Sequence, residues 1–150
     1  MTAGVKTLAA ARTIVVIDWP SRDVSDTLVR AGFAVFVRGG PRDEDFSEFR
    51  IENGEVVAQR TGHAPPHADI VYCHRPLAEL PSIAALAARL GAKMIWSQSG
   101  LDADGARDPK GCWASQADLD AMRHTAESAG LAFVSEPYIG DAARALRRHA

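Results

Sequence analysis

Five short runs of apolar and β-branched residues recur along the chain, each bounded by glycine, proline or polar residues. Such runs are typical of strands buried in a parallel sheet, because both of their faces are covered. Most of the segments between them carry apolar residues at helical spacing, and helices supply the crossovers that parallel strands require. The expected core strands are residues 13–18, 33–38, 69–74, 92–96 and 131–135.

Capping residues mark the expected helices. Ser21 and Ser115 are suitable N-cap residues, and Pro76 is expected in the first turn of the helix that follows the third strand. The last helix is expected to begin at Asp141. The other helices are expected to end at glycines that follow their last apolar position, namely Gly32, Gly91 and Gly130.

Residues 46–60 interrupt the alternation of strands and helices. Asn53-Gly54 stands between two strand-like arms, and this dipeptide favours a two-residue hairpin turn because both positions adopt positive φ. We therefore expect a β-hairpin insertion here in place of a helix. An exposed hairpin edge can pair with another chain, so a homodimer through the hairpin is one hypothesis.

These elements predict a three-layer α/β fold, Rossmann-like, with a mostly parallel five-stranded sheet and the hairpin as an insertion. Residues 1–150 are expected to form a single domain. The expected order of the core strands is 3-2-1-4-5. That order places residues 18–22 beside residues 97–100, at the edge where open α/β sheets bind their ligands.

Composition argues against several classes of function. The net charge of −2 suggests neither nucleic acid nor an anionic membrane as a partner. The longest apolar runs are too short to span a bilayer, and the first residues lack the features of a signal peptide. Cys73 and Cys112 do not make a disulfide framework. We therefore expect a cytoplasmic protein.

No metal-ligand or catalytic pattern emerges from the spacing of reactive residues. His63, His67 and His74 do not have the spacing of a compact ligand set. Cys112 has Lys110 nearby but no identifiable base. We therefore expect neither a bound metal nor catalysis.

Several stretches of the chain, taken in order, resemble one protein family. They are Pro20-Ser21-Arg22, residues 68–71, Arg75-Pro76, the pattern Gly-Ala-Lys-x-x-Trp-x-Gln-x-Gly at residues 91–100, and residues 129–134. Over residues 12–146 the chain resembles the small stand-alone CoA-binding domain proteins, which are related to the N-terminal domain of succinyl-CoA ligase α subunits.

The resemblance implies a non-catalytic module that binds coenzyme A (CoA) or an acyl-CoA. The CoA pyrophosphate would lie against the loop after the first strand, formed by Trp19, Pro20, Ser21 and Arg22. Either Arg38 or Arg42 would meet the 3′-phosphate end. The remaining residues implied are Arg75 and Pro76 at the nucleotide edge, with Gln98, Ser99 and Gly100 lining the cleft near the pantetheine.

Two other functions stay open. Asp18-Trp19 stands where the family has a glycine-bearing turn, and a carboxylate there would repel a diphosphate. A family member without a nucleotide, acting as a protein-interaction or regulatory subunit, is therefore the first alternative. The second is an NAD-linked enzyme, although no G-x-G-x-x-G follows the first strand and Arg38 ends the second strand where an acidic ribose ligand is expected.

Overall fold

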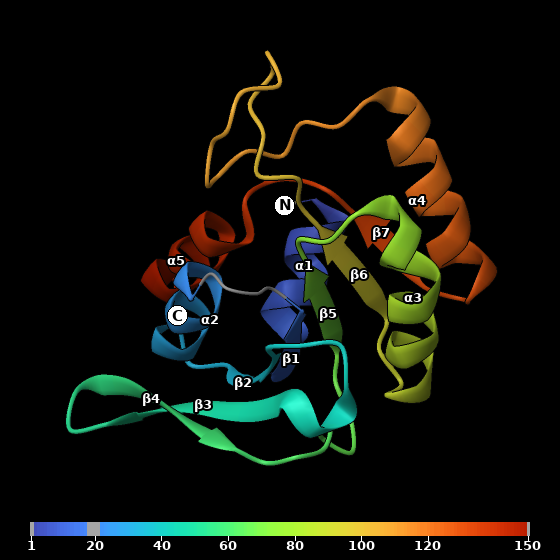
Figure 1. Ribbon diagram of the computed structural model, residues 1–150. Helices are drawn as coiled ribbons and strands as arrows, with labels where there is room; N and C mark the ends of the chain where they lie inside the picture. The colour runs from blue at the N-terminus through green and yellow to red at the C-terminus, as the bar shows by residue number, and fades with distance from the viewer. Residues whose placement is uncertain (1, 18–21, 150) are drawn as a thin grey trace.

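The computed structural model of the protein describes residues 2–17 and 22–149 and contains a seven-stranded sheet (Figure 1). Its strands are β1 Thr13–Ile17, β2 Ala34–Arg38, β3 Phe46–Glu52, β4 Glu55–Arg60, β5 Ile70–Cys73, β6 Met94–Ser97 and β7 Ala132–Val134. They lie in the order β4-β3-β2-β1-β5-β6-β7. Neighbours from β2 to β7 pair in parallel, whereas β3 and β4 add to the outer side of β2 in antiparallel pairing.

Helices cover both faces of this sheet, so the predicted α/β class and its three layers are confirmed. The helices are α1 Ala3–Ala10, α2 Asp23–Arg30, α3 Leu80–Arg89, α4 Gln116–Ser128 and α5 Ile139–His149, with 3₁₀ turns η1 Asp43–Asp45 and η2 Leu77–Glu79. One face is covered by α1, α2 and α5, and the other by α3 and α4. Among the described residues, no helix has the length and apolar character needed to cross a membrane.

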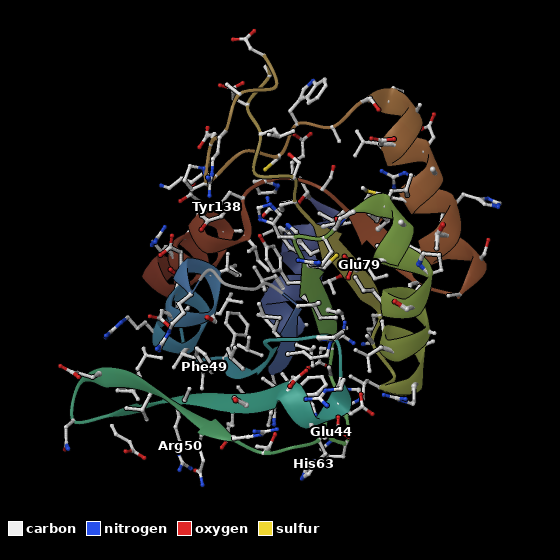
Figure 2. All side chains as sticks on the ribbon, viewed as in Figure 1. Glu44, Phe49, Arg50, His63, Glu79 and Tyr138 are labelled. Atoms are coloured by element: carbon white, nitrogen blue, oxygen red, sulfur yellow. The ribbon has the colours of Figure 1, made fainter. Side chains whose placement is uncertain are left out.

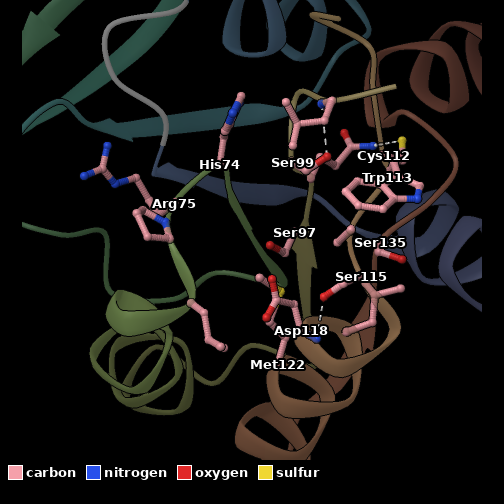
Figure 3. Close-up of a pocket in the computed structure, with 16 residues that line it drawn as sticks. His74, Arg75, Ser97, Ser99, Cys112, Trp113, Ser115, Asp118, Met122 and Ser135 are labelled. Carbon is pink, nitrogen blue, oxygen red and sulfur yellow. Dashed lines mark hydrogen bonds between the residues drawn. The ribbon is translucent and has the colours of Figure 1, made fainter. Parts of the chain in front are cut away.

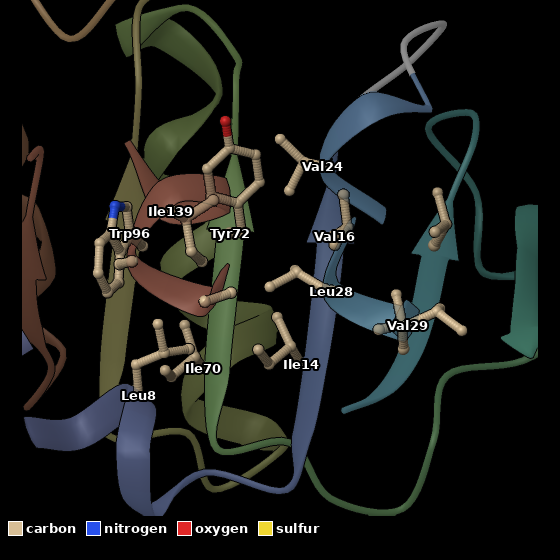
Figure 4. Close-up of a cluster of buried hydrophobic side chains, with 14 of the residues drawn as sticks. Leu8, Ile14, Val16, Val24, Leu28, Val29, Ile70, Tyr72, Trp96 and Ile139 are labelled. Atoms are coloured by element: carbon tan, nitrogen blue, oxygen red, sulfur yellow. The ribbon is translucent and has the colours of Figure 1, made fainter. Parts of the chain in front are cut away.

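Each strand divides its side chains between two cores. Residues Val16, Tyr72 and Trp96 pack toward α1, α2 and α5, as Figure 4 shows. Val71 and Ile95, each one position away, pack toward α3 and α4. This two-residue period is that of a pleated strand buried on both faces, and it explains the near-continuous apolar runs in the sequence.

The strand order differs from the prediction. The core strands lie in the order 2-1-3-4-5, because β5 pairs with β1 and not with β2. β3 already occupies the outer edge of β2, with Val35 opposite Phe49. The order in which the parallel strands are added to the sheet therefore reverses between β1 and β5. Residues 97–100 stand at the end of β6, which β5 separates from β1. The expected pairing of the first and fourth core strands, from which we placed residues 18–22 beside residues 97–100, is therefore wrong, and residues 18–21 themselves lie outside the described residues.

The predicted hairpin is confirmed, but it is part of the sheet and not an addition to a five-stranded one. Asn53 and Gly54 form the two-residue turn between β3 and β4, with φ angles of 53° and 82°. Both values are positive, as a type I′ turn requires. The hairpin extends past the helices that cover the rest of the sheet (Figure 1).

Three helix starts differ from the sequence prediction. α1 is not predicted at all, because its residues are mostly small; it is held by the fully buried Leu8 and by the close approach of Gly4 to Val134. Pro76 precedes η2, so α3 begins only at Leu80. α5 begins at Ile139, two positions before the expected Asp141.

Asp69, just before β5, holds the start of β1. One of its carboxylate oxygens accepts hydrogen bonds from the backbone N–H groups of Arg12 and Thr13 at 2.8 and 3.0 Å, and the other contacts His67 Nε2 at 3.0 Å. Burial opposes the charged form of this carboxylate, but the bonds from Thr13, Arg12 and His67 outweigh it and lower the pKa of Asp69 to about 2. The charged carboxylate therefore stabilises the junction of β1 and β5.

This pKa predicts acid sensitivity. The folded pKa lies below the unfolded value of 3.8, so the unfolded chain binds more protons between these values and stability falls with pH in that window. We expect a loss of about 2 kcal/mol in unfolding free energy as pH falls from about 5 to about 2. Urea unfolding across this range measures it.

Asp69→Asn should flatten that part of the pH profile. Asp104→Asn, in an exposed loop, serves as the control and should retain it. A variant of Asp69 whose stability changes with pH as steeply as the wild type would contradict the assignment.

Candidate functional site

A cavity of about 660 Å³ lies at the carboxyl ends of β5, β6 and β7, on the side of the sheet covered by α3 and α4 (Figure 3). Residues 112–115, which lead into α4, form part of its wall. Ligands of open α/β sheets bind at this edge, outside the carboxyl ends of the strands. The cavity is therefore the candidate site.

Hydroxyl groups and apolar side chains share the lining. Ser97 ends β6 and Ser135 follows β7. Leu77 comes from η2, while Leu119 and Met122 come from α4. An apolar wall with a few placed polar groups is the usual composition of a small-molecule site.

Ser97 offers an unused hydroxyl to this cavity. The residue is only 5% exposed, and its hydroxyl has no hydrogen-bond partner among the described residues. A serine hydroxyl can donate one hydrogen bond and accept two. A ligand or water in the cavity would satisfy it.

The start of α4 brings a carboxylate to the same space. Ser115 is the N-cap, as predicted, and its hydroxyl accepts a hydrogen bond from the backbone N–H of Asp118 at 3.1 Å. The carboxylate of Asp118 lines the cavity. No ion pair joins it to another described residue.

Gln98, a predicted ligand residue, is tied into the fold. Its carboxamide oxygen accepts from the backbone N–H of Ile139 at 3.1 Å. Its Nε2 donates to the carbonyl of Pro137 at 3.2 Å and to Cys112 Sγ at 2.8 Å. Gln98 therefore joins the end of β6 to the start of α5 and to the cavity wall.

Ser99 and Gly100 continue this loop. Ser99 lines the cavity, and its hydroxyl accepts from the backbone N–H of Leu101 at 3.1 Å. Gly100 has a φ of 71°, and a Cβ there would lie 2.5 Å from a ring carbon of His74. Position 100 therefore requires glycine, since only glycine combines this φ with so close a neighbour.

Cys112 and Trp113 occupy the wall opposite the strand ends. Burial raises the pKa of the Cys112 thiol; the hydrogen bond from Gln98 opposes this, while the carboxylates of Glu136, Asp108 and Asp141 add to the rise. The thiol is therefore a poor nucleophile. Trp113 is 44% exposed and lines the cavity.

Two of the predicted arginines lie near each other. Arg38 ends β2 and Arg75 follows β5, on either side of β1. Burial lowers the pKa of Arg38; Asp43 and Glu79 oppose the change, and the nearby charge of Arg75 adds to it. Arg75 donates to a carboxylate oxygen of Glu79 from Nε and Nη2, at 3.0 and 2.7 Å. The Nε of Arg38 is buried and has no hydrogen-bond partner among the described residues.

The other predicted residues lie elsewhere or outside the described residues. Arg22 donates to the carbonyl of Val56 at 3.3 Å, and its guanidinium lies 4.9 Å from the centre of the Phe49 ring, so it faces the hairpin. Arg42 is 70% exposed and lies 3.8 Å from Asp45. Pro76 lines the cavity beside Arg75. Asp18, Trp19, Pro20 and Ser21 fall outside the described residues.

The histidines form no metal site with their neighbours. Within residues 2–17 and 22–149, no group of three or more histidine, cysteine or acidic side chains could hold a metal ion. His67 is bound to Asp69 at the amino end of the sheet, whereas His74 lies at the carboxyl end. His67 and His74 therefore lie at opposite ends of the sheet and do not share a site.

The sequence analysis did not single out Ser135 or Asp118, and it included Ser97 only as part of the ligand edge expected at residues 97–100. The two serines continue the strand positions that face α3 and α4, so the two-residue period of Ile95 and Phe133 could have found them. Asp118 could have been placed from its position three residues after the N-cap Ser115. Its approach to the strand ends depends on how α4 packs.

Comparison with known proteins adds evidence on the fold. No protein-family model and no curated protein matches the chain. A solved structure, "The structure of cell-free ID.343 from Thermus thermophilus", is similar, with 23% sequence identity, a match that covers 94% of each chain and a TM-score of 0.53. At this identity the likeness shows a shared α/β fold alone.

The bonds of Gln98 predict a structural role that is independent of any ligand. Gln98→Leu leaves the Ile139 N–H without its acceptor and removes one donor from the Pro137 carbonyl. We expect the unfolding free energy to fall by about 2–4 kcal/mol, measured by urea denaturation without ligand. Gln59→Leu on the exposed strand β4 is the control and should change stability by less than about 1 kcal/mol. Equal stability of the two variants would contradict this role.

Proposed function

We propose that the protein binds CoA or an acyl-CoA at the carboxyl edge of its sheet and serves as a binding module without catalysis of its own. The observation that carries this proposal is the pair Arg38 and Arg75 on either side of β1, with the buried Nε of Arg38 lacking a partner among the described residues. The resemblance of residues 91–100 to CoA-binding domain proteins supports the choice of ligand.

The arginine pair suits phosphate. A buried donor without an acceptor destabilises the folded chain, and a phosphate oxygen is a strong acceptor for guanidinium. Glu79 holds the Arg75 guanidinium through two hydrogen bonds and so limits the conformations that binding must order. In this arrangement Arg38 meets the 3′-phosphate end and Arg75 the nucleotide edge.

The cavity suits the pantetheine arm. That arm alternates amide groups with methylenes, and the lining alternates Ser97 and Ser135 with Leu119 and Met122. Arg75 lines the cavity as well, so a ligand held at the arginine pair can continue past the end of β6. The volume of about 660 Å³ lies within the usual range of small-ligand sites, roughly 300–1,000 Å³.

A second function, binding of a protein partner, is favoured by the hairpin. β4 is the outermost strand of the sheet, and Ile51 on β3 is 45% exposed. Arg22, which the first proposal would use for phosphate, is instead held against Val56 and Phe49 of this hairpin. Light scattering tests self-association: a dimer that Ile51→Lys converts to a monomer would support this function, and a wild-type monomer that co-purifies with no partner would contradict it.

Calorimetric titration with CoA tests the binding proposal. We expect a Kd below about 1 mM for CoA. We expect weaker binding of 3′-dephospho-CoA, because this ligand lacks the phosphate that Arg38 would bind. Arg38→Gln and Arg75→Gln should each weaken CoA binding by about ten- to hundredfold, the value of hydrogen bonds to charged groups. Arg38→Gln should also remove the preference for CoA over 3′-dephospho-CoA.

Arg50→Gln is the matched control. Arg50 lies on the hairpin, where Figure 2 shows its side chain directed away from the helices, and it pairs with Glu48 and Glu52. Its substitution should leave CoA affinity unchanged. An absence of heat with millimolar CoA, or binding of NADH in preference to CoA, would overturn the proposal.

A further inference from the structure

Asp118 lines the cavity and forms no ion pair with another described residue, whereas Arg75 in the same lining is paired with Glu79. Arg75, the arginine that lines the cavity, is hydrogen bonded twice to Glu79. Asp118 comes from the opposite side, in the first turn of α4. Its charge also offsets the positive end of the α4 dipole, so the helix start offers little attraction to a second anion.

A second group reports the sign of the potential independently. The thiol of Cys112 lines the same cavity, and after burial the charges that raise its pKa are carboxylates, those of Glu136, Asp108 and Asp141. Asp108 lies before α4, Glu136 follows β7, and Asp141 lies in the first turn of α5, where Lys110 and Arg144 pair with it at 3.5 and 3.1 Å. At Cys112, in the wall opposite the strand ends, the neighbouring carboxylates therefore favour a neutral group over an anion.

The hydroxyl of Ser97 can bind a neutral polar group of a ligand between Arg75 and Asp118. The residue is 5% exposed and lines the cavity, and its hydroxyl has no partner in the described part of the chain. Ser97 ends β6, the strand between β5 and β7, so it lies between Arg75, which follows β5, and the residues that β7 and α4 contribute. A ligand that enters at Arg75 passes Ser97 before it reaches Asp118.

We infer that this cavity selects the acyl group of a bound thioester, admitting neutral acyl groups and rejecting those that end in a carboxylate, and that Asp118 is the residue that rejects them. The inference rests on the proposed binding of CoA and adds its substrate class. Two carboxylates that approach each other at the rim of one cavity repel each other, and because Asp118 is an exposed residue there, solvent and salt weaken the effect.

The test compares butyryl-CoA with succinyl-CoA by calorimetry or by quenching of the fluorescence of Trp113 at the cavity wall. We expect the wild type to bind butyryl-CoA about tenfold more tightly than succinyl-CoA. Asp118→Asn should reduce this ratio to about twofold. The ratio in the wild type should also fall as salt is added.

Two further variants separate the effect of the Asp118 charge from the effects of charge elsewhere on α4 and of neutral contacts in the cavity. Asp120→Asn removes a charge of the same helix from a side chain that bonds to Gln116 and does not line the cavity, so it should keep the wild-type ratio. Ser97→Ala should weaken both thioesters by an equal factor of about threefold, because a hydroxyl does not distinguish their charge.

The outcomes distinguish this inference from the function on which it rests. Binding of both thioesters with a ratio that Asp118→Asn leaves unchanged overturns the selectivity and leaves CoA binding intact. A wild type that binds neither CoA nor its thioesters overturns both. A ratio that Asp120→Asn lowers as much as Asp118→Asn does would also overturn the role of Asp118.

Discussion

β1 pairs in parallel with β2 on one side and with β5 on the other, and the site depends on this two-sided pairing. The hairpin strand β3 occupies the outer edge of β2, so the chain must return across β1 to place β5. Asp69 stabilises the return by accepting hydrogen bonds from Arg12, just before β1, and from Thr13, its first residue. As a result Arg38 and Arg75 stand on either side of β1.

The pleat of the strands then divides the polar residues at the carboxyl edge into two groups. Ser97 and Ser135 continue the positions of Ile95 and Phe133, which face α3 and α4, and both line the large cavity. Gln98, one position on from Ser97, turns the other way and bonds to the chain around α5. Adjacent residues therefore serve different purposes, one facing the cavity and the other holding the loop that encloses it.

Much of the local structure could be predicted from the sequence. The core strands, the Asn53-Gly54 turn and the N-cap Ser115 depend on interactions within a few residues, and the structure has all of them. α1 could not be predicted, because its small residues carry little periodicity and Leu8 is held by the tertiary core. The structural role of Gln98 was also missed, since its partners lie about forty residues away in sequence.

The sequence by itself determined an α/β chain with a hairpin, and it located the strand ends where a ligand site would form, because hydrophobic period and turn chemistry are local properties. Only the tertiary structure decided which strands are neighbours. The outer edge of β2 could pair with either β3 or β5, and long-range packing places β3 there. That choice puts β1 between the strands that lead to Arg38 and Arg75, and it moves residues 97–100 away from β1. It also brings Asp118 of α4 to the strand ends, a contact that depends on helix packing and has no local signal.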